Sequence, residues 1–420
     1  MEMHALGALI PALEARRQLL AAAIPVPRIE ELRIDAAVGR IAAVSMTAPA
    51  PVPAFARATW DGYAVRARDT RGATARAPVR LNVVGAIYPE QPFDRPLGPG
   101  DAVAIATGGA MPAGADGVVI FEKVTRIEGA IEVRSPVDRG ARIARPGDDI
   151  PRGSRLVAPG DQLTPVVLGA LAAAGRPTVR VWARPIVEVI PNGNELRAPG
   201  APVGPGLIRE SNNATLGAVI GAAGGIPRLR PPVPDDPAKI SLALRTAMRR
   251  ADLVLATGGS SVGERDYLPR LLPQLGRLLF HGIAVRPGKP TLAAVAREKL
   301  VVGLPGHPAS CLANMYWLVL PVLRRLGHRP GPGWAEEVMP LGAAIDGRSA
   351  GFTSVVPVSI RNGRAFPTFR GSSHVTSLAR AGGFVMVPPG RAVWPRGRRV
   401  RVCRLPSPLA DGGPSPVANL

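Results

Sequence analysis

The stretch ADLVLATGGSSVGERDY, residues 251–267, joins an apolar run to a loop that is rich in glycine, serine and charge. The run 253–257 is continuously apolar up to its last residue, which is typical of a strand buried on both faces of a sheet. The glycines that follow allow backbone N–H groups to approach an anion such as phosphate, because no Cβ is in the way. The acids of the loop could instead hold a metal ion, so both kinds of site stay open at this point.

The order of strand, loop and helix repeats from Pro185 onward. Apolar strands that alternate with helices predict an α/β region with a mostly parallel, doubly wound sheet covered on both faces. In such a sheet, ligands bind beyond the carboxyl ends of the strands. We therefore expect four loops to meet at one edge of the sheet, namely PNGNEL (191–196), TGGSSVGERDY (257–267), RPGKP (286–290) and PGHPAS (305–310).

Breaks rich in proline and glycine divide the chain into three predicted regions. Residues 1–180 form an elongated N-terminal region, helical in part, with a β-rich insertion at about 50–145. Residues 181–328 form the α/β domain. Residues 329–420 return to an alternation of apolar and polar residues with a hairpin signal at Asn362-Gly363, which predicts a small β-barrel.

Three helix starts carry local signals. Thr164 precedes Pro165, and Asp236 precedes Pro237, so each pair predicts a capping side chain followed by proline at the first helical position. Ser211 is the third predicted capping residue. Asp235, one residue before the cap, is then freer to bind a ligand, although both acids could serve the cap instead.

Composition sets the class of protein. The chain has 420 residues, of which 46% are hydrophobic, so packed domains are expected. Its formal charge of +21 is compatible with nucleic-acid binding, but the arginines are scattered and aromatic residues make up only 4%. The N-terminus reads as an amphipathic helix rather than a signal peptide, and the longest apolar run, 311–323, is too short to span a bilayer. Two distant cysteines, Cys311 and Cys403, fit a cytoplasmic protein. We therefore expect neither a nucleic-acid nor a membrane partner.

The four loops supply candidate side chains for a phosphate site with a metal ion. The glycine-rich loop offers backbone N–H groups, and Arg286 and Lys289 offer full positive charges. Mg²⁺ commonly bridges one or two carboxylates and phosphate oxygens, and the available acids are Glu195, Asp235, Asp236, Glu264 and Asp266. Asp266 could also simply pair with Arg265 or Arg270.

Taken together, these loops resemble those of the molybdopterin molybdenumtransferase family, and the resemblance covers almost the whole chain. WDGYAVR (60–66) and TGGAMPAGADGVV (107–119) are similar to family segments near the N-terminus. TGGSSVGERDY, VRPGKP and GLPGHPAS are similar to S-G-G-x-S-x-G-x-x-D-Y, K-P-G-K-P and G-L-P-G-N-P. The order and spacing of these pieces are far more specific than any one of them.

The resemblance implies a homodimer of four-domain subunits whose central domain is Mog-like. It implies the insertion of molybdate into adenylylated molybdopterin, with Mg²⁺, hydrolysis of the adenylate and release of AMP, and contact with other proteins of cofactor assembly. The implied catalytic residues are Asp61, Thr107, Asp149, Glu195, Asp235 and Asp266. Of these, Glu195, Asp235 and Asp266 are the implied metal ligands. The implied substrate-binding residues are Gly258, Gly259, Ser260, Ser261, Arg286, Lys289, Pro305, Pro308 and Ser372.

The chain also departs from the family pattern. Residues 58–60 replace S-A-M before D-G-Y, and Ala56 replaces an aspartate. Arg286 replaces the first lysine of K-P-G-K-P, Gly282 stands where a lysine is common, and His307 replaces the asparagine of P-G-N-P. These changes favour an alternative hypothesis, a non-catalytic or weakly active paralogue that binds or carries the cofactor. A sibling adenylyltransferase is a further alternative, which the long N-terminal part and the C-terminal β region disfavour.

Overall fold

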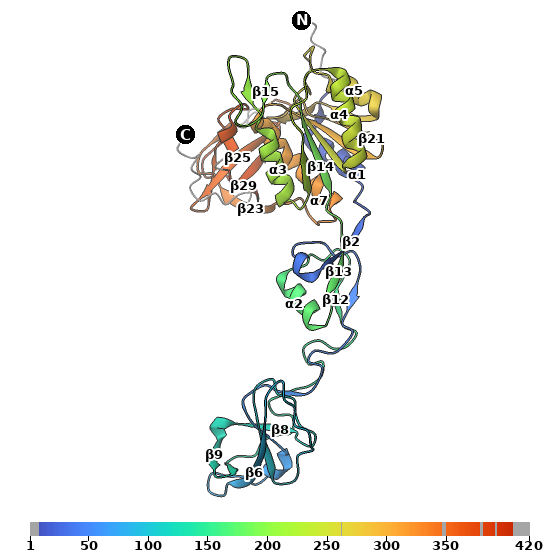
Figure 1. Cartoon of the computed structure of the whole chain (residues 1–420). Coiled ribbons are helices and arrows are strands. Elements are labelled where there is room, and N and C mark those ends of the chain that lie inside the picture. Colours follow the sequence, from blue (N-terminus) through green and yellow to red (C-terminus); the bar gives the residue numbers. More distant parts are fainter. Residues whose placement is uncertain (1–7, 262, 347–349, 379–380, 391–392, 406–420) are drawn as a thin grey trace. The chain divides into compact units, whose positions relative to one another are not determined.

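The chain folds into two compact units (Figure 1). The larger unit comprises Met1–Glu30 and Trp182–Leu420, and the inserted unit comprises Glu31–Val181. The computed structural model describes residues 8–261, 263–346, 350–378, 381–390 and 393–405. Because the inserted unit begins and ends within one continuous chain, the larger unit is built from segments on both sides of it.

The larger unit contains a six-stranded sheet that carries the α/β fold. The first three pairings in the sheet order are parallel and the last two are antiparallel, so only β21 runs against the others and the sheet is mostly parallel as predicted. Its order is β17 (Ile226–Leu229), β14 (Ile186–Pro191), β18 (Leu253–Thr257), β22 (Lys299–Leu304), β21 (Leu292–Ala296) and β19 (Arg277–His281).

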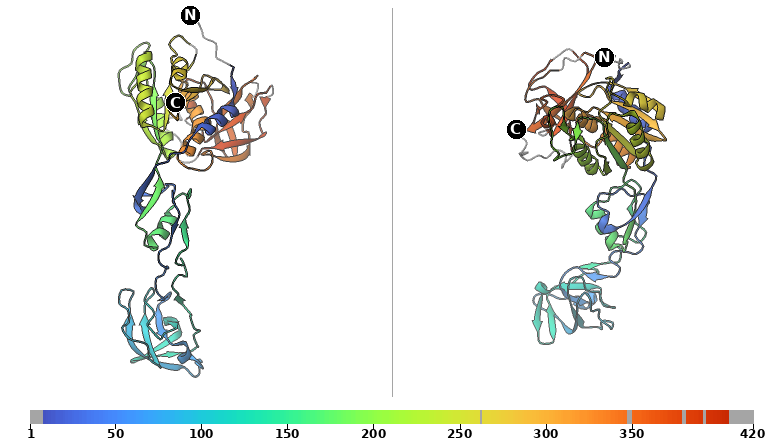
Figure 2. Two further views of the ribbon diagram at one scale, coloured as in Figure 1. Left: turned by 90° about the vertical axis from the view of Figure 1, so that its right-hand side faces the viewer. Right: turned by 45° about the horizontal axis from the view of Figure 1, so that its top comes forward.

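Both faces of this sheet are buried under helices, because successive residues of a strand point to opposite faces. Leu253 and Leu255 pack into one hydrophobic core, and Val254 and Ala256 pack into another. Burying each large aliphatic side chain contributes roughly 1.5–3 kcal/mol. The first core includes α1 (Ala12–Ala22), α3 (Asn212–Ala222), α6 (Pro308–Asn314) and α7 (Leu320–Leu326). The second includes α4 (Pro237–Arg250) and α5 (Leu268–Leu275) (Figures 1 and 2). This arrangement confirms the doubly wound domain.

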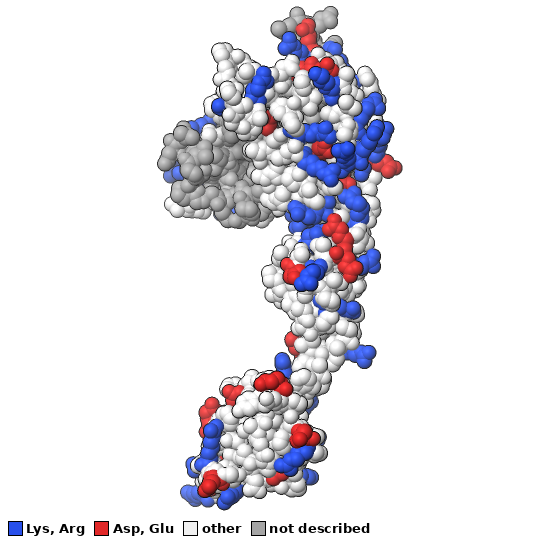
Figure 3. All heavy atoms as spheres, viewed as in Figure 1, with Lys and Arg blue, Asp and Glu red and all other residues white. Residues whose placement is uncertain are grey.

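The start of α4 confirms the predicted cap. The carboxylate of Asp236 accepts hydrogen bonds from the backbone N–H groups of Ala238 and Lys239, at 2.8 and 3.0 Å. Arg249 and Arg250 occupy the last turn, where positive charge suits the helix dipole. Figure 3 shows basic side chains gathered on one side of the larger unit, with acidic side chains among them.

A second sheet of the larger unit contains seven strands and much of the C-terminal region. Its strands are β1 (Ile10–Pro11), β20 (Ile283–Arg286), β25 (Thr353–Arg361), β27 (Gly383–Val387), β29 (Arg399–Arg404) and β23 (Ala335–Pro340), with β26 (Arg364–Pro367) paired to β25. The predicted hairpin turn is present between β25 and β26, because Asn362 and Gly363 have φ angles of 49° and 67°. The N-terminal strand β1 runs parallel to β20, so both ends of the chain contribute to this sheet.

The stretch that precedes the RPGKP loop is divided between the two sheets. The apolar run 278–285 reads as a single strand, but β19 and β20 join different sheets. Gly282 separates them with a φ of 96°, in the left-handed region that favours glycine. The expectation that RPGKP follows a strand of the parallel sheet was therefore wrong, since this loop leaves the second sheet and enters β21.

The inserted unit has its own cores. A six-stranded sheet contains β8 (Gly117–Ile120), β5 (Gly62–Val65), β7 (Asp101–Ile105), β6 (Val79–Ile87), β10 (Ala130–Val133) and β9 (Val124–Ile127). The remainder carries α2 (Pro165–Ala173), whose N–H of Val167 is capped by Thr164 as predicted, at 3.4 Å. Short strand pairs complete it: β3 (Met46–Thr47) with β12 (Arg155–Val157), and β4 (Arg57–Ala58) with β11 (Ile143–Ala144). The chain enters along β2 (Ile29–Arg33) and leaves along β13 (Thr178–Trp182), and these two strands pair.

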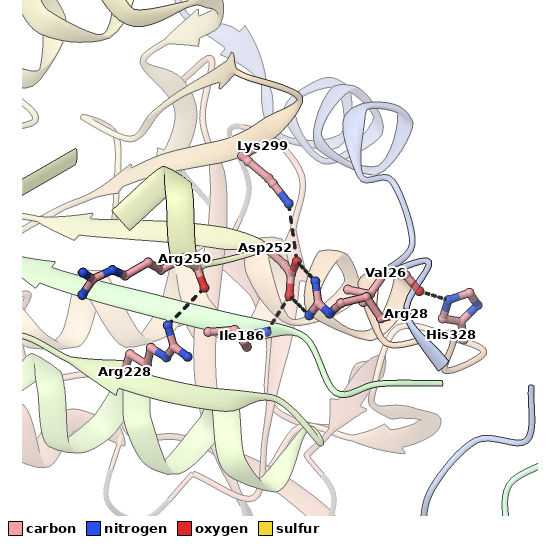
Figure 4. A network of polar contacts seen from close by, with 8 residues as sticks. All are labelled: Val26, Arg28, Ile186, Arg228, Arg250, Asp252, Lys299 and His328. Atoms are coloured by element: carbon pink, nitrogen blue, oxygen red, sulfur yellow. Dashed lines mark hydrogen bonds and ion pairs between the residues drawn. The ribbon is translucent and has the colours of Figure 1, made fainter. Parts of the chain in front are cut away.

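A polar network anchors the segments of the larger unit that lead to and from the inserted unit (Figure 4). Arg28 donates two hydrogen bonds to Asp252, at 2.9 and 2.8 Å, and the backbone N–H of Ile186 donates a third at 2.9 Å. Lys299 lies 3.5 Å from the same carboxylate. Asp252 therefore ties the segment before β2 and the start of β14 to the beginning of β18.

Cys311 and Cys403 are both free and buried, in a helix and a strand. His328 lies at a helix end, where its ring stacks on Trp182 and its Nε2 is 2.8 Å from the carbonyl oxygen of Val26. Within the described residues, no helix has the length and apolar character needed to cross a membrane.

Candidate active site

A cavity of about 710 Å³ opens at the carboxyl edge of the parallel strands. All four predicted loops contribute to its wall, those after β14, β18 and β22 with several residues and RPGKP with Pro290, and the start of α3 completes it. The lining residues are Asn192, Glu195, Leu196, Ile208, Arg209, Glu210, Ser211, Asn212, Thr257, Gly258, Gly259, Ser260, Ser261, Asp266, Pro290, Pro305, Gly306, His307, Pro308 and Ser373. This is the place where a doubly wound sheet usually binds its ligand.

The glycine-rich loop is packed tightly against the loop after β14. Gly258 has a φ of 81°, and a Cβ added there would overlap the carbonyl oxygen of Asn192. The backbone N–H of Asn192 in turn donates to the carbonyl of Thr257 at 2.8 Å. Ser260 is buried and donates to the carbonyl of Leu304 at 3.3 Å, which links the loop to the end of β22. Glycine is therefore required at position 258 for both backbone conformation and space.

Two of the predicted metal ligands lie on the cavity wall. Glu195 and Asp266 both line the cavity. One oxygen of Asp266 accepts a hydrogen bond from the backbone N–H of Gly263 at 2.7 Å, and this bond shapes its own loop. No group of three or more histidine, cysteine, aspartate or glutamate side chains within the described residues is placed to hold a metal ion.

The third predicted ligand has a structural partner instead. Asp235 accepts a hydrogen bond from the backbone N–H of Asn194 at 3.1 Å, and its own N–H donates to Asn194 Oδ1 at 3.1 Å. Asp235 is not among the residues that line the cavity. It fixes the loop that carries Glu195, one residue away from Asn194.

The two predicted cationic side chains do not belong to the cavity wall. Arg286 and Lys289 are exposed and neither lines the cavity, whereas Pro290, the next residue, does. The guanidinium carbon of Arg286 lies 4.3 Å from the ring centre of Phe352. This placement follows from the division of the strand at Gly282, since the loop that carries both cations starts from the second sheet.

The loop after β22 meets the C-terminal region. Pro305 and Pro308 line the cavity, and His307 precedes the short helix α6 (Pro308–Asn314). The backbone N–H of Ala309 donates to the carbonyl of Ser372 at 3.1 Å. Ser372 therefore contacts the start of α6 through its backbone carbonyl oxygen.

Sequence reasoning missed part of the cavity wall. Glu210 is 4% exposed, and both its carboxylate oxygens accept from the backbone N–H of Asn213, at 3.0 and 3.1 Å. Burial raises the pKa of Glu210 above its usual range. Asn212 is also buried, and its Nδ2 donates to the carbonyl of Gly306 at 2.9 Å. Ser211 stands at the predicted cap position, but its side chain makes no capping bond. Nothing in the sequence signals the burial of Glu210, although its place before a helix start hints at a capping role.

Three further predicted residues belong to the inserted unit. Asp61 accepts from both the backbone N–H and the hydroxyl of Thr107, at 2.7 and 2.8 Å. These bonds, the backbone one first, lower the pKa of Asp61. Asp149 is exposed, and its N–H donates to the carbonyl of Val52 at 3.1 Å. The structure therefore brings Asp61 and Thr107 together within their own unit.

The fold and the cavity define a multidomain protein with a molybdopterin-binding type of α/β domain, as comparison with known families bears out. Residues 10–175 match the MoeA N-terminal region (domain I and II), residues 188–325 match the probable molybdopterin binding domain, and residues 343–405 match the MoeA C-terminal region (domain IV). The chain belongs to the molybdopterin molybdenumtransferase family, known as MoeA.

Individual relatives agree with this assignment over nearly the full length. The molybdopterin molybdenumtransferase of Bacillus subtilis is 34% identical over 383 residues, which cover 89% of each chain. That of Staphylococcus aureus is 29% identical over 416 residues, which cover 96% of this chain and 97% of its own. The crystal structure of the molybdopterin biosynthesis MoeA protein from Pyrococcus horikosii matches with a TM-score of 0.83 and 36% identity, over 94% of this chain and 99% of that one.

Proposed function

We propose that the protein inserts molybdate into adenylylated molybdopterin, with hydrolysis of the adenylate and release of AMP. Membership of the molybdenumtransferase family supports the reaction. The observation that carries the proposal is the cavity, because it joins a glycine-rich loop, the start of helix α3 and the carboxylates of Glu195, Glu210 and Asp266 at one edge of the sheet. These are the groups needed to hold a phosphorylated pterin and to cleave a phosphoanhydride.

The cavity suits an anionic group on one side. The glycine-rich loop brings its backbone close to the cavity, where Gly259 has no Cβ to block an anion, and the N-terminus of the 11-residue helix α3 adds partial positive charge. Arg209 adds a full charge. Lys289, beside the lining residue Pro290, would neutralise further charge on phosphate or molybdate.

The acidic residues on the wall support a requirement for Mg²⁺. Glu195, Glu210 and Asp266 would repel a phosphate dianion if no cation lay between them. Mg²⁺ needs only one or two protein carboxylates, with water and phosphate oxygens as further ligands, so Glu195 and Asp266 fit this role. When bound, the ion would neutralise phosphate charge during hydrolysis. The same carboxylates would orient the water that adds to the adenylate phosphorus while the bond to the bridging oxygen breaks and AMP leaves.

The test is turnover of purified protein with adenylylated molybdopterin, molybdate and Mg²⁺, measured as AMP and as molybdenum-loaded cofactor. Asp266→Asn and Glu195→Gln should each lower kcat by about 10²–10³-fold, the usual cost of removing a group that stabilises developing charge. Glu264→Gln is the matched control, because Glu264 is an exposed acid of the same loop that does not line the cavity.

Absence of both products from the parent protein would refute the proposal. Binding of the adenylylated pterin without AMP release would support the binding-only alternative that Gly282 and Arg286 suggest. Gly282 has a φ of 96°, so a lysine introduced there would strain the backbone as well as add charge. The roles of Asp61, Thr107 and Asp149, and a homodimer, are further proposals from the family resemblance.

A further inference from the structure

The loop Arg286–Thr291 crosses from one sheet of the larger unit to the other. It starts at the end of β20 in the second sheet and leads into β21 in the parallel sheet. Between the two strands, residues 287–291 are not held by pairing within either sheet. Two backbone bonds close it across its base: Ile283 N–H donates to the carbonyl of Lys289, and Gly282 N–H donates to the carbonyl of Thr291, both at 2.9 Å.

A buried asparagine supplies the remaining support. Asn314 is 0% exposed, and its Nδ2 donates to the carbonyl of Gly288 at 3.0 Å and to Thr291 Oγ1 at 2.6 Å. The hydroxyl of Thr291 donates to the same carbonyl at 2.8 Å. Trp317 Nε1 donates to Asn314 Oδ1 at 2.7 Å and thereby fixes which way the amide faces. Both N–H donors and the oxygen acceptor of the amide group are engaged, so the amide can hold the loop in one conformation.

The fit between this asparagine and the loop is close. Gly288 has a φ of 109°, and a Cβ added there would overlap the side-chain amide of Asn314. Asn314 ends α6, and the π-helix Met315–Val319 follows at once. Short π-helical segments occur frequently at functional sites. Met315 and Trp317 are fully buried in an apolar core, where an amide is costly unless all its bonds are made.

We infer that Asn314 is a positioning residue for anion binding: it holds the Arg286–Thr291 loop so that Lys289 stands beside the cavity, ready for the phosphate of the substrate. The inference rests on the proposed function, because it takes Lys289 to meet a phosphate there. Asn314 itself does not contact the substrate and acts through the loop. Removing the amide would let Lys289 sample many positions, which weakens phosphate binding without removing any charge.

The test is a double-mutant cycle on the affinity for AMP, the product expected from the proposed reaction, with full-length protein at low salt. Asn314→Ala and Lys289→Ala should each weaken AMP binding by about 10-fold. The double variant should also lose about 10-fold rather than 100-fold, because both changes remove the same contact. Asn314→Ala should flatten the salt dependence of AMP binding as Lys289→Ala does, although it leaves every charge in place.

Two further variants keep the test decisive if Asn314→Ala folds poorly. Thr291→Val removes only one hydroxyl of the network and should weaken AMP binding in the same non-additive way. Thr70→Val is the control for general loss of stability, because the buried Thr70 hydroxyl makes two local hydrogen bonds in the inserted unit. It should leave AMP affinity unchanged.

Additive losses in the cycle, or an unchanged affinity in Asn314→Ala when Lys289→Ala is impaired, would overturn the inference and leave the proposed function standing. The inference would also be overturned if the parent protein turns over substrate and the Lys289→Ala variant binds AMP as tightly as the parent does. Failure of the parent protein to bind AMP and to turn over would remove the proposed function and this inference together.

Discussion

Glu210 shows how a single charge is held at the wall of the cavity. Its carboxylate is almost wholly removed from water, and its protein partner is the backbone N–H of Asn213. Burial disfavours the charged form, so the folded-state pKa lies above the unfolded value. Stability from this group is therefore fully present below the unfolded pKa and is lost as the pH rises through the folded pKa.

Glu210→Gln should accordingly stabilise the protein at neutral pH. Glutamine keeps an oxygen that can accept from Asn213 and carries no charge, so we expect a gain of roughly 0.5–2 kcal/mol, the usual size of a single-site effect. The gain should shrink toward pH 4, about where a free glutamate becomes neutral. Denaturant unfolding of both proteins across this pH range measures it, and a difference that does not change with pH would contradict the assigned cause.

At the scale of elements, Asp252 joins three segments that are far apart in the sequence. Burial alone would raise its pKa, but the hydrogen bonds from Arg28 and Ile186 and the charges of Arg28 and Lys299 together lower it. A lowered pKa means that this stability is present above the unfolded value and is lost as the pH falls. The Arg28 side chain is 48% exposed, so screening reduces the ion-pair part.

Asp252→Asn should destabilise the larger unit by about 1–2 kcal/mol at neutral pH, since the amide loses the charge and one acceptor for Arg28. The difference from the parent should fall below about pH 4, where the aspartate is itself protonated in the unfolded chain. Unfolding followed by a probe in the larger unit checks this. Equal stability of the two proteins at pH 7 would show that the network makes no net contribution.

The elements also show how far sequence reasoning reached. The strands before the loops at 191, 257 and 305 were predictable, because they are apolar, short and followed by glycine-containing turns. The cap at Asp236 was predictable from its proline neighbour. The division of 278–285 was not, because periodicity within one run cannot tell which sheet each half will join. The burial of Glu210 and Asn314 was not predictable either, because it depends on contacts with residues that are distant in sequence.

On the scale of the whole molecule, the inserted unit has the features of an independently folding domain. Its hydrophobic clusters draw only on residues between Leu32 and Val181. The chain enters and leaves it through the paired strands β2 and β13, and Thr178 donates a hydrogen bond to Glu31 at 2.6 Å. Its two ends therefore lie side by side, which is the usual condition for a tolerated domain insertion.

A fragment of residues 31–181 should consequently fold without the rest of the chain. We expect a cooperative thermal unfolding transition and dispersed amide resonances, because the fragment keeps its own cores. The matched fragment 182–420 lacks α1, whose Leu19 is fully buried in the core of the larger unit, and it should be markedly less stable. A disordered 31–181 fragment would show that the inserted unit depends on the larger one.

The pairing of β1 with β20 has a consequence for the order of events during synthesis. Ile10 and Pro11 are synthesised before the inserted unit, yet their partners Ile283 and Ala284 follow more than 270 residues later. Residues 31–181, which supply the hydrophobic clusters of the inserted unit, are all synthesised long before then. We expect the inserted unit to fold first, while β1 stays unpaired until β20, about two thirds of the way along the chain, has been synthesised.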